Sequence, residues 1–319
     1  IREDLALSEG MAGLLSSGLF VGNCVSLTIA AFLTRWAGPR ATATLAGICA
    51  TTGLVGVAFA QSDLQFAIAM LLAGSAAGLT LPPVVTAICA EVVKGRRALA
   101  TTVVNAGTSA GIVASAPLAL LAYGDWRLAY LLFALVAGIT TLGSFAATPA
   151  IDSACGGASQ KARVSLRVFW EAPRVRALLI SAFLCGIVLA PYWTFGGEIL
   201  AQQAGWSGEE IGFLWMVLGA AGLFGAVSGA LVRRFGVGIV HDASFVLMSA
   251  SLFLLMLSPI NPWFPLIGAA LQSSSYMSLS GAYLVWGVDD VPKDPAGITA
   301  ATFLMMPLGI ALGAYVFGH

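Results

Sequence analysis

The sequence predicts an all-α membrane protein with ten transmembrane helices, and three observations carry this prediction. Of the 319 residues, 59% are hydrophobic and 9% are charged, against roughly 25% charged in an average soluble domain. The charged residues divide the chain into uncharged stretches, most of them as long as one membrane span. Lysine and arginine gather at alternate ends of these stretches. So few charges could not cover the surface of a soluble protein of this size. The sequence therefore implies that most of the surface faces lipid.

The expected helices follow from cutting the chain at its charges. A bilayer-spanning helix needs about 20 apolar residues, and a charge at its centre costs roughly 2.5–3.5 kcal/mol. The uncharged stretches are residues 10–34, 41–62, 64–90, 98–124, 128–151, 177–197, 211–232, 243–288 and 295–319. The stretch 243–288 is twice the length of a span and contains Pro259-Ile260-Asn261-Pro262, a strong turn signal. We therefore expect two helices there and ten in all.

The basic residues predict the orientation of these helices. All of the 15 lysines and arginines except Arg2 and Arg127 fall on one side of the ten-helix topology. The positive-inside rule assigns that side to the cytoplasm. We expect an integral protein of a bacterial inner membrane. Its N-terminal bundle would be residues 1–150, its cytoplasmic linker 151–173 and its C-terminal bundle 174–319.

A short motif occurs twice, in equivalent places. Residues 32–38 read FLTRWAG and residues 230–236 read ALVRRFG, and each closes an uncharged stretch. A second pair, Ser-x-x-x-x-Gly at 8–13 and 207–212, precedes them at nearly the same offset. The two copies predict a six-helix unit repeated with unchanged orientation, one known way to build a transporter. The second copy is preceded by its own span, so we infer a 6+6 protein whose first and last helices lie outside this sequence.

These turns resemble those of the major facilitator superfamily, whose loop between its second and third helices reads Gly-x-Leu-x-Asp-Arg-x-Gly-Arg-Arg. The second copy keeps Gly229, Leu231, Arg234 and Gly236, and the first keeps Leu33, Gly38 and Arg40. Arginine replaces the family's aspartate in both copies, as Arg35 and as Arg233. Residues 91–98, EVVKGRRA, and residues 124–127, GDWR, are similar to the family's turn between its fourth and fifth helices and to the start of its sixth. The resemblance covers essentially the whole chain.

The resemblance implies a secondary active transporter that works by alternating access between two six-helix bundles. It places a central cavity between the family's helices 1, 4, 7 and 10, of which the last two hold Tyr192-Trp193 and Gln272 with Tyr276. Gln272, Tyr276 and Tyr283 also fall on one face of a helix by their spacing. The predicted substrate-binding residues are Asn105, Tyr192, Trp193, Gln272 and Tyr276. The alternative is that the aromatic residues pack between helices or face the lipid.

Charged residues at the cytoplasmic helix ends form the predicted gate. Its members are Arg35, Arg40, Glu91, Arg96, Arg233 and Arg234. Their positive charges repel one another, so an acidic residue or a helix C-terminus must offset them. We expect Glu91 to pair with Arg35 or Arg40.

The sequence argues against several other functions. Residues 107–111, GTSAG, match the nucleophile motif of serine hydrolases, but Ser109 lies in mid-helix without a strand or sharp turn, so we expect no enzyme and no catalytic residue. None of the three lysines is followed by Ser or Thr, so no Walker A loop is present. The five cysteines have no paired spacing, which predicts neither metal site nor cofactor. A net charge of zero gives no case for nucleic acid.

The expected partners are the lipid bilayer, a small-molecule substrate, and a coupling proton or ion. No charged residue lies in the middle of any of the ten predicted spans. This favours a neutral, zwitterionic or apolar solute. Within this sequence, His241-Asp242 is the best candidate for binding and releasing a coupling proton. A non-transporting sensor or scaffold on the same fold stays open as the alternative function.

Overall fold

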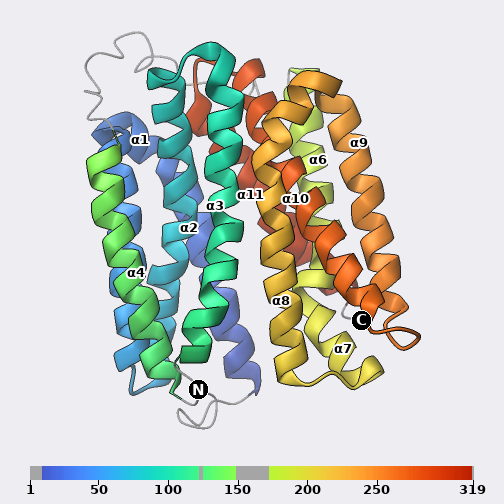
Figure 1. Cartoon of the computed structure of the whole chain (residues 1–319). Helices are drawn as coiled ribbons and strands as arrows, with labels where there is room; N and C mark the ends of the chain where they lie inside the picture. The colour runs from blue at the N-terminus through green and yellow to red at the C-terminus, as the bar shows by residue number, and fades with distance from the viewer. Residues whose placement is uncertain (1–8, 122–124, 149–171, 318–319) are drawn as a thin grey trace. The chain divides into compact units, whose positions relative to one another are not determined.

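The structure is a computed structural model that describes residues 9–121, 125–148 and 172–317 (Figure 1). The regular structure of these residues is helical. In chain order the elements are α1 (Glu9–Phe59), α2 (Asp63–Glu91), α3 (Lys94–Leu121), α4 (Trp126–Ala147), α6 (Pro173–Ala190), the π-helical turn η1 (Pro191–Phe195), α7 (Gly196–Ala204), α8 (Gly208–Gly222), the 3₁₀ turn η2 (Leu223–Val227), α9 (Ser228–Met256), α10 (Trp263–Asp290) and α11 (Pro295–Phe317). Residues 151–171 of the expected cytoplasmic linker 151–173 lie outside the described residues.

Seven helical segments of the described chain are long and apolar enough to cross a membrane. The sequence pattern predicted ten, and the lower number has two sources. Gly22–Phe59, with 38 residues, and Gly208–Met256, with 49, each take in two of the predicted spans. The serine-rich α10 is not among the seven.

Both long segments contain a glycine at which two helices join. Gly38 in α1 has φ 84° and ψ 165°, and Gly236 in α9 has φ 82° and ψ 159°. These two residues end the repeated motifs FLTRWAG and ALVRRFG. Glycine lacks a Cβ and adopts such backbone angles readily, whereas other residues are strained there. The repeated motif therefore encodes the same backbone turn twice.

The helices form two compact units, and each unit contains segments from both halves of the sequence. The first comprises Ile1–Glu91, Pro117–Ser165 and Lys293–Leu304, and the second comprises Val92–Ala116, Leu166–Pro292 and Met305–His319. Most of α3 thus belongs with the second unit, and the first turns of α11 belong with the first. The division into bundles at 1–150 and 174–319 stays a prediction.

In the first unit, α1 packs against α2 and α4. Arg127, at the start of α4, donates from Nη1 to the carbonyls of Ala58 (2.7 Å) and Ala60 (2.9 Å) at the end of α1. The last carbonyls of a helix have no partner within it, so this arginine satisfies two of them. Its guanidinium also lies 4.4 Å from the centre of the Trp126 ring. Arg127 therefore links the start of α4 to the end of α1.

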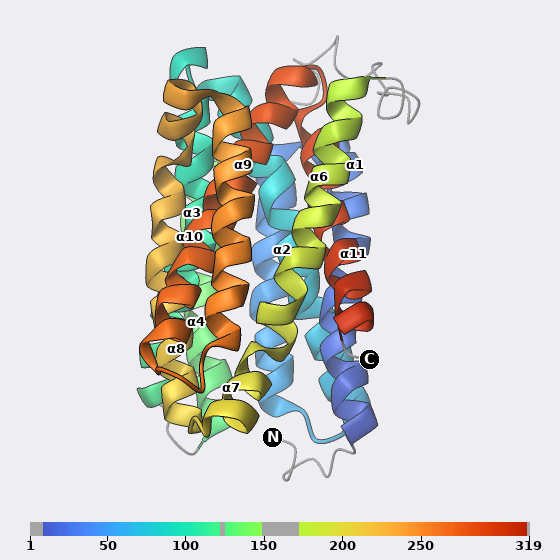
Figure 2. The ribbon, with the colours of Figure 1, turned by 90° about the vertical axis from the view of Figure 1, so that its right-hand side faces the viewer.

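In the second unit, α10 packs against α6, α8, η2 and α9. Buried residues occur along its length from Pro265 to Gly287. Figure 2 shows α6 leading into α7. Both helices belong to the same unit as α9 and α10. The central position of α10 within this unit makes its side chains the natural place to look for a site.

Candidate functional site

The helix that begins as α6 is interrupted at η1, and two predicted substrate-binding residues lie in this interruption. Pro191 has no backbone N–H, so the regular hydrogen-bond pattern of an α-helix cannot continue through it. The chain forms a π-helical turn over Pro191–Phe195 and resumes as α7. Single π turns within helices are frequent at functional sites. The turn carries Tyr192 and Trp193.

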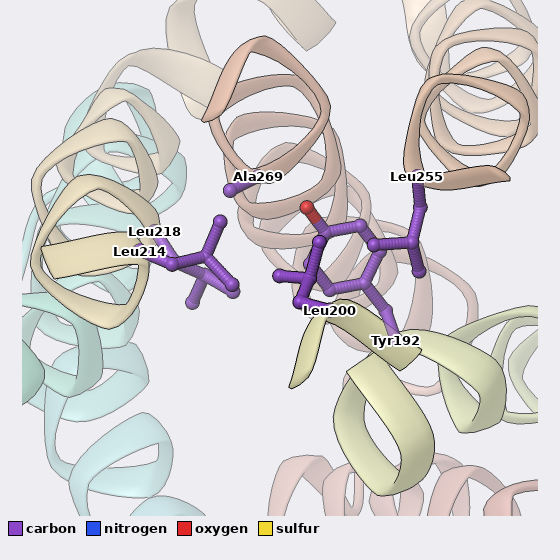
Figure 3. Packing of buried hydrophobic residues seen from close by; sticks show 6 residues of the cluster. All are labelled: Tyr192, Leu200, Leu214, Leu218, Leu255 and Ala269. Carbon is purple, nitrogen blue, oxygen red and sulfur yellow. The ribbon is translucent and has the colours of Figure 1, made fainter. Parts of the chain in front are cut away.

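Tyr192 is buried in the packing of the second unit. Its side chain is 1% exposed and packs with Leu200, Leu214, Leu218, Leu255 and Ala269 (Figure 3). Its hydroxyl donates to the carbonyl of Pro265 at 2.9 Å, near the start of α10. The structure thus places Tyr192 where it ties the η1 turn to α10.

Trp193 is half-buried and belongs to a group of three aromatic rings. Its ring centre lies 5.4 Å from that of Trp215 on α8 and 6.3 Å from that of Tyr276 on α10. Both pairs meet edge to face, a favoured arrangement for aromatic rings. The structure therefore brings Trp193 and Tyr276 together, and the sequence reasoning missed Trp215.

Gln272 is fully buried on α10, with one half of its amide satisfied. Ser251 Oγ on α9 donates to its Oε1. Its Nε2 has no hydrogen-bond partner among the described residues. A buried amide donor without a partner costs roughly 1–3 kcal/mol. Such a group is a reason to look for a ligand or water that would satisfy it.

Asn105 joins α3 to α10 inside the second unit. The residue is 5% exposed, and its Nδ2 donates to Ser280 Oγ at 2.6 Å. Close by, the hydroxyls of Ser109 and Ser273 are buried without partners among the described residues. A Cβ on Gly222 of α8 would meet both of these serines. The contact between α3, α8 and α10 is therefore both close and polar.

Four side chains of α10 form one polar row, which we call the α10 stripe: Gln272, Tyr276, Ser280 and Tyr283. Positions separated by four, eight and eleven residues share one side of a helix. Each member contacts a different element, namely Ser251 on α9, Trp193 in η1, Asn105 on α3 and Ser181 on α6. The stripe connects four of the five predicted substrate-binding residues; the fifth, Tyr192, contacts α10 at Pro265.

A second polar feature, which we call the histidine chain, meets the stripe at Tyr283. His241 Nδ1 lies 2.7 Å from Asp242 Oδ1, and His241 Nε2 lies 2.6 Å from Ser181 Oγ. Ser181 Oγ lies 2.6 Å from Tyr283 Oη. The sequence pointed to His241-Asp242 but not to Ser181, because nothing in the spacing relates α6 to α9.

The order Asp242, His241, Ser181 is that of a serine-hydrolase triad, but its setting differs. A catalytic serine presents its hydroxyl to a substrate. Ser181 is 8% exposed, and its oxygen lies between His241 and Tyr283. Its hydroxyl therefore faces protein groups.

Among the predicted gate residues, Arg35 has a partner that the sequence did not suggest. Its Nη1 donates to Asp294 Oδ2 at 2.9 Å. The other carboxylate oxygen, Oδ1, accepts the backbone N–H of Gly297 at 2.9 Å and so caps α11. The expected pairing of Arg35 with Glu91 is wrong in this structure, because Asp294 holds the guanidinium and Glu91 is exposed.

The other gate residues bind backbone groups or lie at the surface. Arg40 Nε donates to the carbonyl of Thr148 at 2.6 Å, instead of pairing with Glu91. Arg233 Nη1 donates to the carbonyl of Gly95 at 3.0 Å, in the first turn of α3. Arg234 lies over the Phe235 ring, and Arg96 is exposed.

Apolar helices of spanning length around a buried polar stripe define a membrane protein of the transporter class. The family model described as Major Facilitator Superfamily matches residues 1–314. The chain therefore belongs to the major facilitator superfamily, a family of membrane transporters and not of enzymes.

One solved structure shows how far the likeness of fold extends. It is that of the proton:xylose symporter XylE of the same superfamily, bound to 6-bromo-6-deoxy-D-glucose. The TM-score is 0.74 at 12% sequence identity, over 99% of this chain and 82% of that one. At this identity the likeness shows a shared fold. A search of the curated proteins found no match.

Proposed function

We propose that this protein is a secondary active transporter that moves a small neutral or zwitterionic solute by alternating access between two six-helix bundles. The observation that carries the proposal is the α10 stripe. Polar side chains within membrane helices are costly and mark pathways for substrates and ions. In this stripe, Gln272 keeps a buried amide donor without a partner among the described residues.

The proposal includes a topology of ten spans with the basic turns in the cytoplasm of a bacterial cell. A helix rises 1.5 Å per residue, so 38 residues extend about 57 Å, well beyond the roughly 30 Å of a hydrocarbon core. We propose that the segments Gly22–Phe59 and Gly208–Met256 each cross twice and turn at Gly38 and Gly236. With α10 counted as a span, this topology has ten.

Sugars are the first candidate substrates. The solved relative carries xylose and binds a glucose derivative, and both are neutral molecules with many hydroxyls. The amide of Gln272 could accept or donate hydrogen bonds to such hydroxyls. The half-buried Trp193 and Tyr276 offer apolar rings beside it. A zwitterionic solute is the second class to test.

The test is solute counterflow with the purified full-length protein in liposomes, using a panel of labelled pentoses, hexoses and amino acids. Gln272→Ala should weaken apparent affinity about tenfold, because one good hydrogen bond is worth roughly 1.4 kcal/mol. Ser274→Ala is the matched control, since the Ser274 hydroxyl bonds to the carbonyl of Ala270 in its own helix. Equal effects of both substitutions would contradict the assignment of the site.

The alternative function gives a different result in the same experiment. A sensor or scaffold would bind a solute, as measured by calorimetry, without exchanging it across the liposome membrane. Counterflow by the wild-type protein excludes that alternative.

A further inference from the structure

We propose that His241 is a proton-binding site, and that Ser181 and Tyr283 carry the effect of its protonation to the α10 stripe. The coupling part of this inference rests on the proposed transport function. The proton-binding part stands on the geometry of the second unit alone, where α9, α6 and α10 each supply a member of the histidine chain.

The histidine chain leads from solvent to the interior. The Asp242 side chain is 82% exposed and the His241 side chain is 25% exposed. Ser181 is 8% exposed and Tyr283 is 1% exposed. Each link is 2.6 or 2.7 Å long, within the range of good hydrogen bonds. A proton taken up by His241 can therefore influence a buried hydroxyl on α10.

The direction of these hydrogen bonds depends on the charge of His241. An ionised Asp242 can only accept, so Nδ1 of His241 carries a hydrogen and donates it to the carboxylate. In neutral His241, Nε2 is then an acceptor. The Ser181 hydroxyl donates to Nε2, and the Tyr283 hydroxyl donates to Ser181 Oγ. Each hydroxyl hydrogen points toward the imidazole.

Protonation reverses the inner part of the chain. The added proton binds at Nε2, which then donates to Ser181 Oγ. The Ser181 hydroxyl must turn its hydrogen to the oxygen of Tyr283, and the Tyr283 hydrogen must find another acceptor. No covalent bond other than N–H forms, and the charge of +1 stays on the imidazolium beside Asp242. At the α10 stripe, the effect of protonation is that the Tyr283 hydroxyl no longer donates to Ser181 Oγ.

Charged and aromatic groups surround His241 on its own helix and on α10. Asp242, on the same helix, lies 2.7 Å from Nδ1 of His241. On α10, the Trp286 ring lies 6.4 Å from the imidazole and donates from Nε1 to Asp290 Oδ2 at 2.9 Å. Asp290 also binds Arg174 of α6 at 3.3 Å, so its charge is offset. Histidine is the side chain whose charge ordinarily changes between pH 5 and 8.

The Tyr283 hydroxyl lies one turn of α10 beyond Ser280, which accepts from Asn105. Tyr276 lies two turns before Tyr283 on the same stripe. A change in the hydrogen bonding of Tyr283 therefore occurs on the face of α10 that carries Gln272 and Tyr276, two of the predicted substrate-binding residues. This placement puts the proton-binding chain and the predicted substrate-binding residues on one face of α10.

The transport arm of the test separates exchange from accumulation. With the solute found by counterflow, wild-type protein in liposomes should accumulate it when an inward pH gradient is imposed, and should move protons with it. His241→Gln should retain counterflow and lose at least tenfold in gradient-driven accumulation. Tyr283→Phe should reduce accumulation in the same direction. Tyr130→Phe, which removes the hydroxyl of a half-buried tyrosine in the first unit, should leave both activities unchanged.

The second arm needs no substrate. The sequence has two histidines, His241 and His319, so a His319→Gln protein with ¹⁵N-labelled histidine gives the signals of His241 alone. At alkaline pH the hydrogen should reside on Nδ1, and between pH 5 and 8 the ring should become doubly protonated. Tyr283→Phe should shift the Nε2 resonance, because the chain that ends on Nε2 loses its last donor.

The outcomes distinguish this inference from the proposed function. Wild-type counterflow without proton movement, or full accumulation by His241→Gln, would overturn the coupling and leave the transporter proposal intact. Absence of counterflow with any solute would count against the transporter proposal, and the resonance experiment would still decide the proton site. A His241 ring that keeps one protonation state from pH 5 to 8, or an Nε2 resonance unchanged by Tyr283→Phe, would overturn the site itself.

Discussion

Replacing Asp294 by asparagine tests the Arg35–Asp294 contact directly. The carboxylate has two functions, because Oδ2 binds Arg35 Nη1 and Oδ1 caps α11 through the N–H of Gly297, each at 2.9 Å. Asparagine is as good an N-cap as aspartate. Asp294→Asn therefore keeps the cap and removes the ion pair, whereas Asp294→Ala removes both.

The expected magnitude follows from the burial of the two partners. A hydrogen bond to a charged group contributes roughly 1.5–3 kcal/mol when it is shielded, and an exposed ion pair about 0–1 kcal/mol. The Asp294 side chain is 7% exposed and that of Arg35 is 36% exposed, so this pair lies between these limits. We expect Asp294→Asn to lower the free energy of unfolding by about 1–2 kcal/mol. Asp294→Ala should cost roughly 1 kcal/mol more, the typical value of a cap.

The assay is reversible denaturant unfolding of the purified full-length protein in mixed micelles, with a double-mutant cycle. Asp294→Asn, Arg35→Gln and the double variant should show a coupling of about 1 kcal/mol, which contacting residues typically show. Glu91→Gln with Arg35→Gln is the matched cycle for the partner expected from sequence, and it should be additive. Additivity in the Asp294 cycle, or coupling in the Glu91 cycle, would refute the reasoning.

Two further predictions concern the turns and the topology. Gly236→Ala should lower stability by roughly 1–3 kcal/mol, because alanine is strained at φ 82°; Gly238→Ala, where the structure leaves open space, should not, and equal effects would contradict the role of the turn. A single cysteine at position 202 should react with an impermeant reagent in intact cells while one at 161 should not, and the reverse pattern would overturn the orientation.

The helices and the shared face of α10 could be predicted because both depend on local pattern. Charges are costly in lipid, so their positions mark helix ends, as at Asp63 and Glu91 for α2. The spacing of Gln272, Tyr276 and Tyr283 fixes their common side as soon as a helix forms. The repeated glycine motif likewise predicted a turn, and Gly38 and Gly236 adopt nearly identical backbone angles.

The division of roles between Tyr192 and Trp193 could not be predicted at the same level. Neighbouring residues of a helix point in directions about 100° apart, so two adjacent aromatic residues seldom face the same space. The structure directs Tyr192 into the packing of Figure 3 and Trp193 toward Tyr276. The sequence identified the pair, but no pattern in it indicates which of the two residues contacts the α10 stripe.

Partners distant in sequence were the hardest to predict, and Arg35 shows why. The repeated motif resembles a family turn that carries an aspartate, and this chain has arginine there in both copies. The energy of an ion pair is unchanged when the two charges exchange places, so the acid can reside on the other helix. Asp294, at the start of α11, is 259 residues away in the chain, and no local pattern relates it to Arg35.

The exchanged charges also suit the helices that carry them. Arg35 lies in the last turn of α1 before Gly38, where the helix dipole favours a positive charge, and Asp294 caps the N-terminus of α11, where it favours a negative one. The second copy of the motif follows the same geometry, because Arg233 reaches the carbonyl of Gly95 in the first turn of α3. In each unit the motif's arginine thus binds the beginning of another helix, and its glycine turns the chain. Among the described residues, Arg35 of the first copy meets a carboxylate and Arg233 of the second copy meets a backbone carbonyl.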